Sequence, residues 1–212
     1  MAHHQQQGPW VLKERITGYL RADMPSRVKL YREFWNVDDR LLPVPGHYHS
    51  YEPPSLDVWP TVITVQLSTN SLERTDYHDG LNPEYRVSYA MRTYVWVKNE
   101  SPEDATEARD RLTTVVRASL LDRQSFDLGP SHPQNPIILD ETSVREEFSD
   151  VTYVKGDRVV CGAYISYTAI VDEAIVRPDI ATVQSLTIDV HGSGDRQADL
   201  TDLPQVTQIS LP

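Results

Sequence analysis

The sequence predicts an α+β fold: a curved, mainly antiparallel β-sheet with a long amphipathic helix packed on one face, an N-terminal helical segment and an extended C-terminal arm. Two observations carry most of this prediction. Residues 85–98 alternate in polarity like a long strand and lead directly into a helix start at residue 101. Residues 158–171 repeat that alternation after a short turn. Two long strands of similar pattern with a helix between them favour one antiparallel sheet covered by that helix.

The N-terminal part is predicted to be helical and then irregular. A helix is expected from about Pro9 to Ala22, where apolar residues recur at helical spacing. A second segment, Ser26 to Trp35, is expected to dock its aromatic end on the core. Between Leu42 and Pro60, proline and tyrosine are frequent and no period appears, which indicates an ordered but irregular loop.

The sheet is expected to begin with a β-branched strand over residues 61–68, followed by a polar excursion from Asn70 to Asn82. The long strand over residues 85–98 then divides its side chains between two faces. Its core face carries Tyr85, Val87, Tyr89, Met91, Thr93, Val95 and Val97. Its other face is amphipathic and carries Arg86, Ser88, Arg92, Tyr94, Trp96 and Lys98.

The helix that follows has a clear N-terminal signature. Ser101 can cap the free amides, Pro102 suits the first helical position, and Glu103 and Asp104 favour the positive end of the helix. Three- and four-residue spacing then predicts a narrow buried stripe. The stripe consists of Ala105, Ala108, Leu112, Val115, Val116, Ser119 and Leu120.

The rest of the chain adds strands and an arm. Residues 137–139 form a brief apolar segment, and residues 151–154 and 158–171 flank a short turn as a hairpin. From residue 178 the chain has one basic residue against five acidic ones, and its piece Ser185 to Val190 could add to a sheet edge. The expected division is therefore an N-terminal segment, 1–59, an α+β core, 60–177, and an acidic arm, 178–212.

Composition limits the function. The 212 residues carry a formal charge of −11 with a pI near 5.0, which disfavours nonspecific binding to nucleic acid. No apolar run approaches the ~20 residues of a membrane span, and the start lacks a secretion signal. A single cysteine, Cys161, indicates neither an internal disulfide nor a cysteine-based metal site. We therefore expect a soluble protein made in the cytoplasm.

One group of residues could bind a metal ion. His47, His49 and Asp57 have the imidazole and carboxylate groups that suit zinc or iron. Alternate residues of an extended loop are, however, expected to point to opposite sides, which disfavours the site. We therefore expect no metal site and no cofactor.

Other candidate catalytic groups have simpler structural explanations. His78 and Asp79 lie in a predicted turn, and Cys161 lies on the apolar face of a predicted strand. Two sets of carboxylates could be imagined as acid–base pairs, but capping and solvated faces explain them. They are Glu103, Asp104 and Glu107 in the helix and Glu141, Glu146 and Glu147 after it. We expect no catalytic residues, and the protein is not predicted to be an enzyme.

The order of these elements resembles a known protein family. The phrase RTYVWVKNESPEDATEARDRLTTVVRASLL, preceded by a strand and a polar excursion and followed by a hairpin with VVCGAYISYTAIV, carries the resemblance. It is similar to the tail terminator, or tail completion, proteins of long-tailed bacteriophages, particularly those that infect actinobacteria. The resemblance spans roughly residues 60–173.

The resemblance implies an architectural role in the neck of the virion, assembled in the host cytoplasm. A homo-oligomeric ring of six subunits would cap the tail tube protein, stop its polymerisation and contact the head-side connector proteins, while DNA passes through the lumen. A ring requires a heterologous interface. The candidate interface residues are Arg86, Arg92, Tyr94 and Trp96, because tyrosine, tryptophan and arginine dominate interface energetics.

Alternatives remain open from the sequence. Tyr94 and Trp96 could instead pack under the N-terminal helix. The protein could be another neck component, either a connector stopper or a tube subunit. A small metal-dependent hydrolase that uses His47, His49 and Asp57 is the alternative from a different class.

Overall fold

The computed structural model describes residues 8–53, 55–75, 83–122, 126, 137–149, 153–155 and 158–174. These residues form two helices and six strands. In chain order they are α1 (Gly8–Trp35), β1 (His47–His49), β2 (Thr61–Arg74), β3 (Glu84–Asn99), α2 (Pro102–Asp122), β4 (Ile138–Phe148), β5 (Tyr153–Lys155) and β6 (Arg158–Ala174). The predicted arm after residue 178 and the turn at Asp79 lie outside the described residues.

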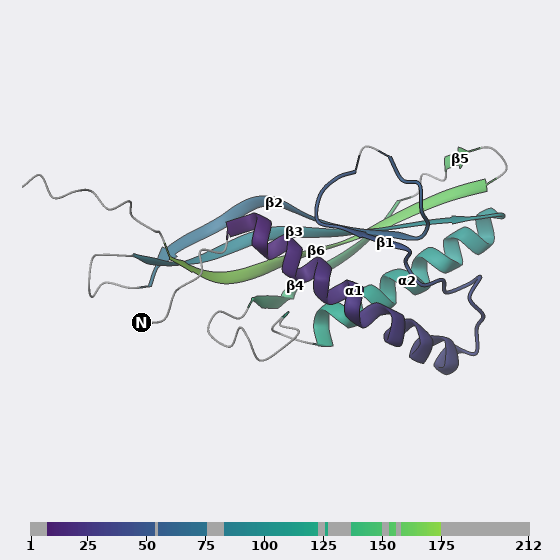
Figure 1. The fold of residues 1–212 in the computed structure, drawn as a ribbon, viewed down its shortest axis with the longest axis horizontal. Helices are drawn as coiled ribbons and strands as arrows, with labels where there is room; N and C mark the ends of the chain where they lie inside the picture. Colours follow the sequence, from purple (N-terminus) through teal and green to yellow (C-terminus); the bar gives the residue numbers. More distant parts are fainter. Residues whose placement is uncertain are drawn as a thin grey trace, which may run out of the picture. The chain divides into compact units, whose positions relative to one another are not determined.

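The strands form one mixed sheet, and the predicted α+β class is confirmed (Figure 1). The main path runs β1-β2-β3-β6-β4, and β5 pairs with β6 next to the start of that strand. β1 is parallel to β2, whereas the other pairs are antiparallel. The long central pair joins β3 to β6 from Glu84↔Ala174 to Asn99↔Val159.

The alternation of the two long strands is confirmed. In β3, odd-numbered residues from Val87 to Val97 are buried and their even-numbered neighbours are partly or fully exposed. The inward side chains of β6 from Val159 to Val171 are buried in the same way. One core cluster joins most of these residues to α1 and α2, so both helices cover the same face of the sheet. Val159 and Cys161 of β6 form a second, smaller cluster with Ala105 of α2. The predicted antiparallel pairing of β5 with β6 is confirmed, but Lys155, expected in the turn, belongs to β5 and pairs with Arg158. Residues 151 and 152 of the predicted first strand lie outside the described residues.

α1 is longer than the sequence predicts. The expected helix ended near Ala22, but the structure has one continuous helix that includes Pro25. Proline inside a helix removes a backbone hydrogen bond and costs about 3 kcal/mol. A stripe with four-residue spacing continues through it, and all of its side chains are fully buried. The stripe consists of Leu12, Ile16, Leu20, Met24 and Val28.

The aromatic end of α1 docks only in part. Tyr31 and Trp35 pack against the core and contact each other edge to face, with ring centroids 4.8 Å apart. Phe34, in contrast, is 80% exposed. Neither of the two described helices combines the length and apolar composition that crossing a membrane requires.

α2 starts where its sequence signature places it. The Oγ of Ser101 accepts a hydrogen bond from the backbone N–H of Asp104 at 3.0 Å, and Pro102 is the first helical residue. Polar contacts then join α2 to α1. The Oγ of Ser119 donates to Asp23 at 2.7 Å, and Arg27 pairs with Asp122 at 2.6 Å. The two helices are thus joined by hydrogen bonds and ion pairs as well as by apolar packing.

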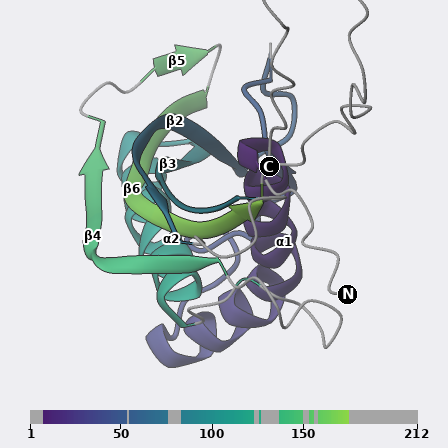
Figure 2. The ribbon, with the colours of Figure 1, turned by 90° about the vertical axis from the view of Figure 1, so that its left-hand side faces the viewer.

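Three strands differ from their predicted bounds. The irregular loop expected from Leu42 to Pro60 contains β1, and β2 runs six residues past the expected end at Ser68. β4 extends to Phe148, far beyond the predicted 137–139. Its register against β6 shifts between Asp140 and Arg145, and Figure 2 shows β4 turning sharply along its length. The sequence hides these strands because they are short, exposed or polar, so no period of two appears.

A chain of hydroxyl groups crosses the core between three strands. The Oγ1 atoms of Thr64 in β2 and Thr93 in β3 are 3.3 Å apart, and Thr93 is 3.0 Å from the Tyr167 hydroxyl in β6. Both threonines are fully buried, and Tyr167 is nearly so. Because buried polar groups require partners, each hydroxyl depends on the next one.

Candidate protein-interaction face

The outer face of the sheet is the side opposite the two helices. It is formed by the even-numbered residues of β3 from Arg86 to Lys98 together with the residues that pair with them in β6. Side chains on neighbouring positions of a strand point to opposite faces, and the odd-numbered ones pack with α1 and α2. Tyr94 and Trp96 therefore do not pack under the N-terminal helix.

A cluster of cationic and aromatic side chains lies at the centre of the outer face. The guanidinium carbon of Arg92 is 4.0 Å from the ring centroid of Tyr164 and 5.7 Å from that of Tyr94. Its Nη1 donates to the Tyr94 hydroxyl at 3.2 Å, and the two tyrosine rings are 5.6 Å apart. The Tyr164 hydroxyl donates to Glu147 of β4. These contacts hold Arg92 across two rings, an arrangement stabilised by cation–π attraction.

Hydrogen bonding keeps this cluster in a fixed charge state. The bond to Tyr94 raises the pKa of Arg92 above its already high ordinary value, so the guanidinium stays cationic. The bond to Glu147, followed by desolvation, raises the pKa of Tyr164, so its hydroxyl stays protonated. The cluster therefore offers the cation of Arg92 beside protonated tyrosine, which suits recognition of a protein surface.

Trp96 extends the cluster over a glycine. Trp96 pairs with Gly162 of β6, and a Cβ at position 162 would lie 2.8 Å from Cζ3 of the indole ring. Only glycine leaves room for the indole in its present position. Trp96 is half-buried as a result.

We expect Gly162→Ala to lower the free energy of unfolding by about 1–3 kcal/mol, because the added methyl group displaces the indole of Trp96. Urea denaturation measures the loss. Gly18→Ala is the matched control, since nothing lies within 4 Å of a Cβ at that helical position. Alanine is favoured over glycine in a helix by about 1 kcal/mol, so the control should gain stability. Equal effects of the two substitutions would contradict the packing of Trp96 on Gly162.

The structure brings together three of the four predicted interface residues and separates the fourth. Arg92, Tyr94 and Trp96 are consecutive on one face of β3. Arg86 lies about 20 Å away along the strand, at about 3.3 Å per residue, and pairs with Asp172 at 3.0 Å. Tyr164 and Glu147 were not predicted as members of the cluster. The alternation of β6 places Tyr164 on the outer face, but only the register with β3 brings it to Tyr94.

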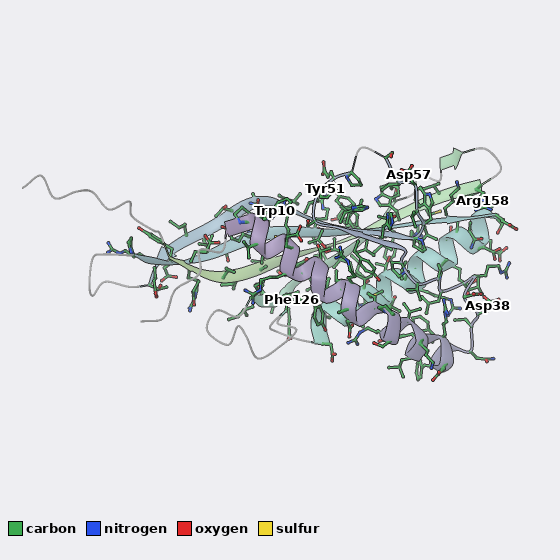
Figure 3. All side chains as sticks on the ribbon, in the orientation of Figure 1. Trp10, Asp38, Tyr51, Asp57, Phe126 and Arg158 are labelled. Atoms are coloured by element: carbon green, nitrogen blue, oxygen red, sulfur yellow. The ribbon has the colours of Figure 1, made fainter. Side chains whose placement is uncertain are left out.

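The predicted metal ligands are arranged differently from the expectation. The prediction that alternate residues point to opposite sides is wrong here, because residues two apart in β1 share one side. The ring centroids of His47 and His49 are 5.6 Å apart, and the Tyr51 ring contacts His49 edge to face with its centroid at 5.4 Å. Asp57, which is labelled in Figure 3, is exposed. Its carboxylate accepts a hydrogen bond from Ser55. Among the described residues, no three metal-ligating side chains gather.

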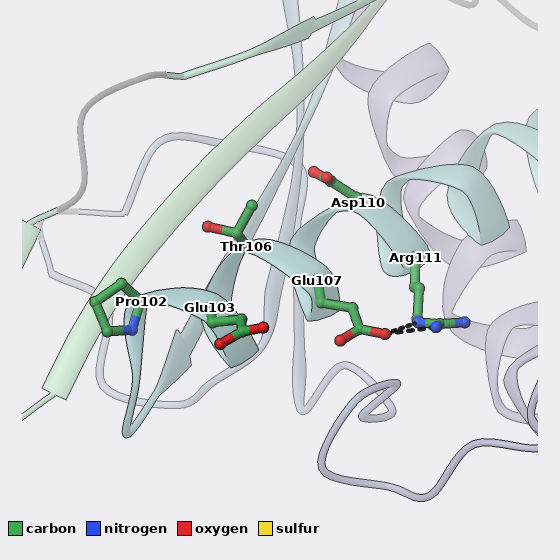
Figure 4. A pocket seen from close by; sticks show the side chains of 6 residues that line it. All are labelled: Pro102, Glu103, Thr106, Glu107, Asp110 and Arg111. Carbon is green, nitrogen blue, oxygen red and sulfur yellow. Dashed lines mark hydrogen bonds and ion pairs between the residues drawn. The ribbon is translucent and has the colours of Figure 1, made fainter.

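The predicted carboxylate sets have structural roles in the described part of the chain. A shallow depression on α2 is lined by residues of that single helix (Figure 4). They are Pro102, Glu103, Thr106, Glu107, Asp110 and Arg111. Glu107 is paired with Arg111, and in β4 Glu146 is paired with Arg117 at 2.6 Å. Cys161 is buried beside Ala105 and Val159, as expected of a small core residue.

Comparison with known proteins adds no assignment: no protein-family model matches this chain, and no curated protein matches it.

Proposed function

We propose that this protein is a structural component of the neck of a long-tailed bacteriophage, where a ring of copies closes the tail tube. In this role it ends polymerisation of the tube protein and joins the tail to the head-side connector. We also propose that this protein has the expected fold for such a role. It has a curved sheet, a long amphipathic helix packed on that sheet, and a C-terminal arm. The strand, capped helix and hairpin that carry the family resemblance supply its first support.

The residues on the outer face of the sheet give the proposal its main support. A ring subunit needs a surface that recognises a different surface on its neighbour. The cluster of Arg92, Tyr94, Trp96 and Tyr164 combines the residue types that dominate interface energetics, on a face that neither helix covers. Its side chains are already fixed by mutual contacts, so docking would cost little additional ordering.

The charge of the chain fits a conduit for DNA. A formal charge of −11 lets a duplex pass without adhering, because like charges repel. The protein therefore needs no specific contact with DNA in the proposed role.

Electron microscopy of particles produced while this gene is silenced tests the proposal. We expect overlong headless tubes beside filled, tailless heads. A gene copy supplied in trans should restore normal particles, whereas one that carries Arg92→Ala with Tyr94→Ala should not, because the outer face loses its central contacts. Phe34→Ala is the control, since it removes an aromatic side chain that is 80% exposed on α1, away from the outer face.

Two other outcomes would redirect the assignment. Filled heads and tails of correct length that fail to join would indicate a connector protein rather than a terminator. Normal infectious particles after silencing would contradict a role in virion assembly.

A further inference from the structure

Two histidines lie side by side on an end strand of the sheet. β1 pairs with β2 alone among the described strands, so it forms one end of the sheet. Tyr48 points inward and is 9% exposed, whereas His47 is exposed and His49 is half-buried on the opposite side of the strand. The two imidazoles belong neither to the core nor to the cluster around Arg92 on the outer face.

The separation of the two rings suits a shared metal ion. Zn²⁺ binds histidine nitrogen at about 2.0–2.1 Å, so two imidazoles on one tetrahedral ion have ring centroids roughly 5 Å apart. The observed distance between the centroids is 5.6 Å, with an angle of 90° between the planes. Rotation about the broad second side-chain torsion can turn the ring nitrogens toward one point without moving the strand. We propose that His47 and His49 form a two-imidazole site for a divalent transition metal ion.

The chemistry of the two rings supports this site. Imidazole suits zinc, copper and nickel, whereas magnesium prefers oxygen ligands.

Two ligands define a weak and exchangeable site. Tyr51 contacts His49 edge to face, and the Asp57 carboxylate accepts hydrogen bonds from Ser55. Water fills the remaining coordination positions in this proposal. The site therefore differs both from a closed structural zinc site with four protein ligands and from a catalytic site with three.

Calorimetric titration of the full chain with Zn²⁺ at neutral pH tests the inference. The parent protein carries His3→Ala and His4→Ala, because adjacent histidines at the start of the chain could also bind the ion. We expect one Zn²⁺ per chain and a rise in melting temperature with added Zn²⁺, since the ion binds the folded state. Removing groups that merely support a ligand weakens metal binding about 10–100-fold, so His47→Ala or His49→Ala should weaken it at least tenfold.

Two controls sharpen the test. Asp57→Ala should leave the affinity unchanged, and Mg²⁺ in place of Zn²⁺ should give no heat of binding. Circular dichroism verifies that each variant remains folded. Unchanged Zn²⁺ affinity after both histidine substitutions would overturn the site, and so would a tenfold loss in Asp57→Ala, which would indicate a different ligand set. Neither result bears on the proposed role in the virion.

Discussion

Leu20→Ala is expected to lower the free energy of unfolding by about 2–5 kcal/mol, the range for a fully buried leucine that leaves a cavity. Leu20 lies at the middle of the buried stripe of α1, between Ile16 and Met24. The loss arises from the apolar surface that the removed methyl groups cover and from the incomplete collapse of α1 around the gap. Urea denaturation followed by circular dichroism gives the change directly.

Leu30 provides a matched control in the same helix. It is the same residue type, lies ten residues further along α1 and is 60% exposed. Leu30→Ala should change the free energy of unfolding by no more than about 0.5 kcal/mol, as is usual for surface positions. A similar loss at both positions would contradict the orientation of α1 on the sheet.

Thr93→Val should destabilise the protein by about 1–3 kcal/mol although the side chain keeps its shape. The substitution removes the central hydroxyl of the chain that links Thr64 to Tyr167, and it leaves both partners buried without it. Burial also raises the pKa of Tyr167, so its hydroxyl stays protonated and needs a hydrogen-bond partner inside the core. Urea denaturation measures the loss.

A double variant tests whether the hydroxyls act together. Thr93→Val combined with Tyr167→Phe removes both partners of one hydrogen bond, so its cost should be less than the sum of the two single costs. Thr69→Val in the exposed half of β2 is the control and should be nearly neutral. Strictly additive losses would show that the two hydroxyls do not depend on each other.

The elements that could be predicted from the sequence are those with a local signature. β3 and β6 show their period of two over many residues. The four residues from Ser101 to Asp104 mark the start of α2. The C-terminal end of α1 could not be predicted, because Pro25 is a local stop signal. Tertiary packing of Met24 and Val28 on the core continues the helix past it. β1 is a three-residue strand defined by its parallel partner.

The candidate interface shows the same division. Alternation along one strand is enough to place Arg92, Tyr94 and Trp96 on a common face. Tyr164 and Glu147 come from two other strands, and their positions depend on register, which a single sequence does not reveal. The geometry of His47 and His49 also depends on β1 being a strand, whereas the local sequence predicts an irregular loop there.

The pairing of β3 with β6 has a consequence for synthesis of the chain. β3 ends at Asn99, but the strand that covers its second edge ends only at Ala174. At about 5–20 residues per second, the ribosome needs roughly 4–15 s to make the intervening chain. During that interval β3 is paired with β2 along one edge only, and the backbone groups of its second edge lack a neighbouring strand. A ribosome that stalls after α2 would release a fragment whose longest strand is ready to pair with another copy of itself.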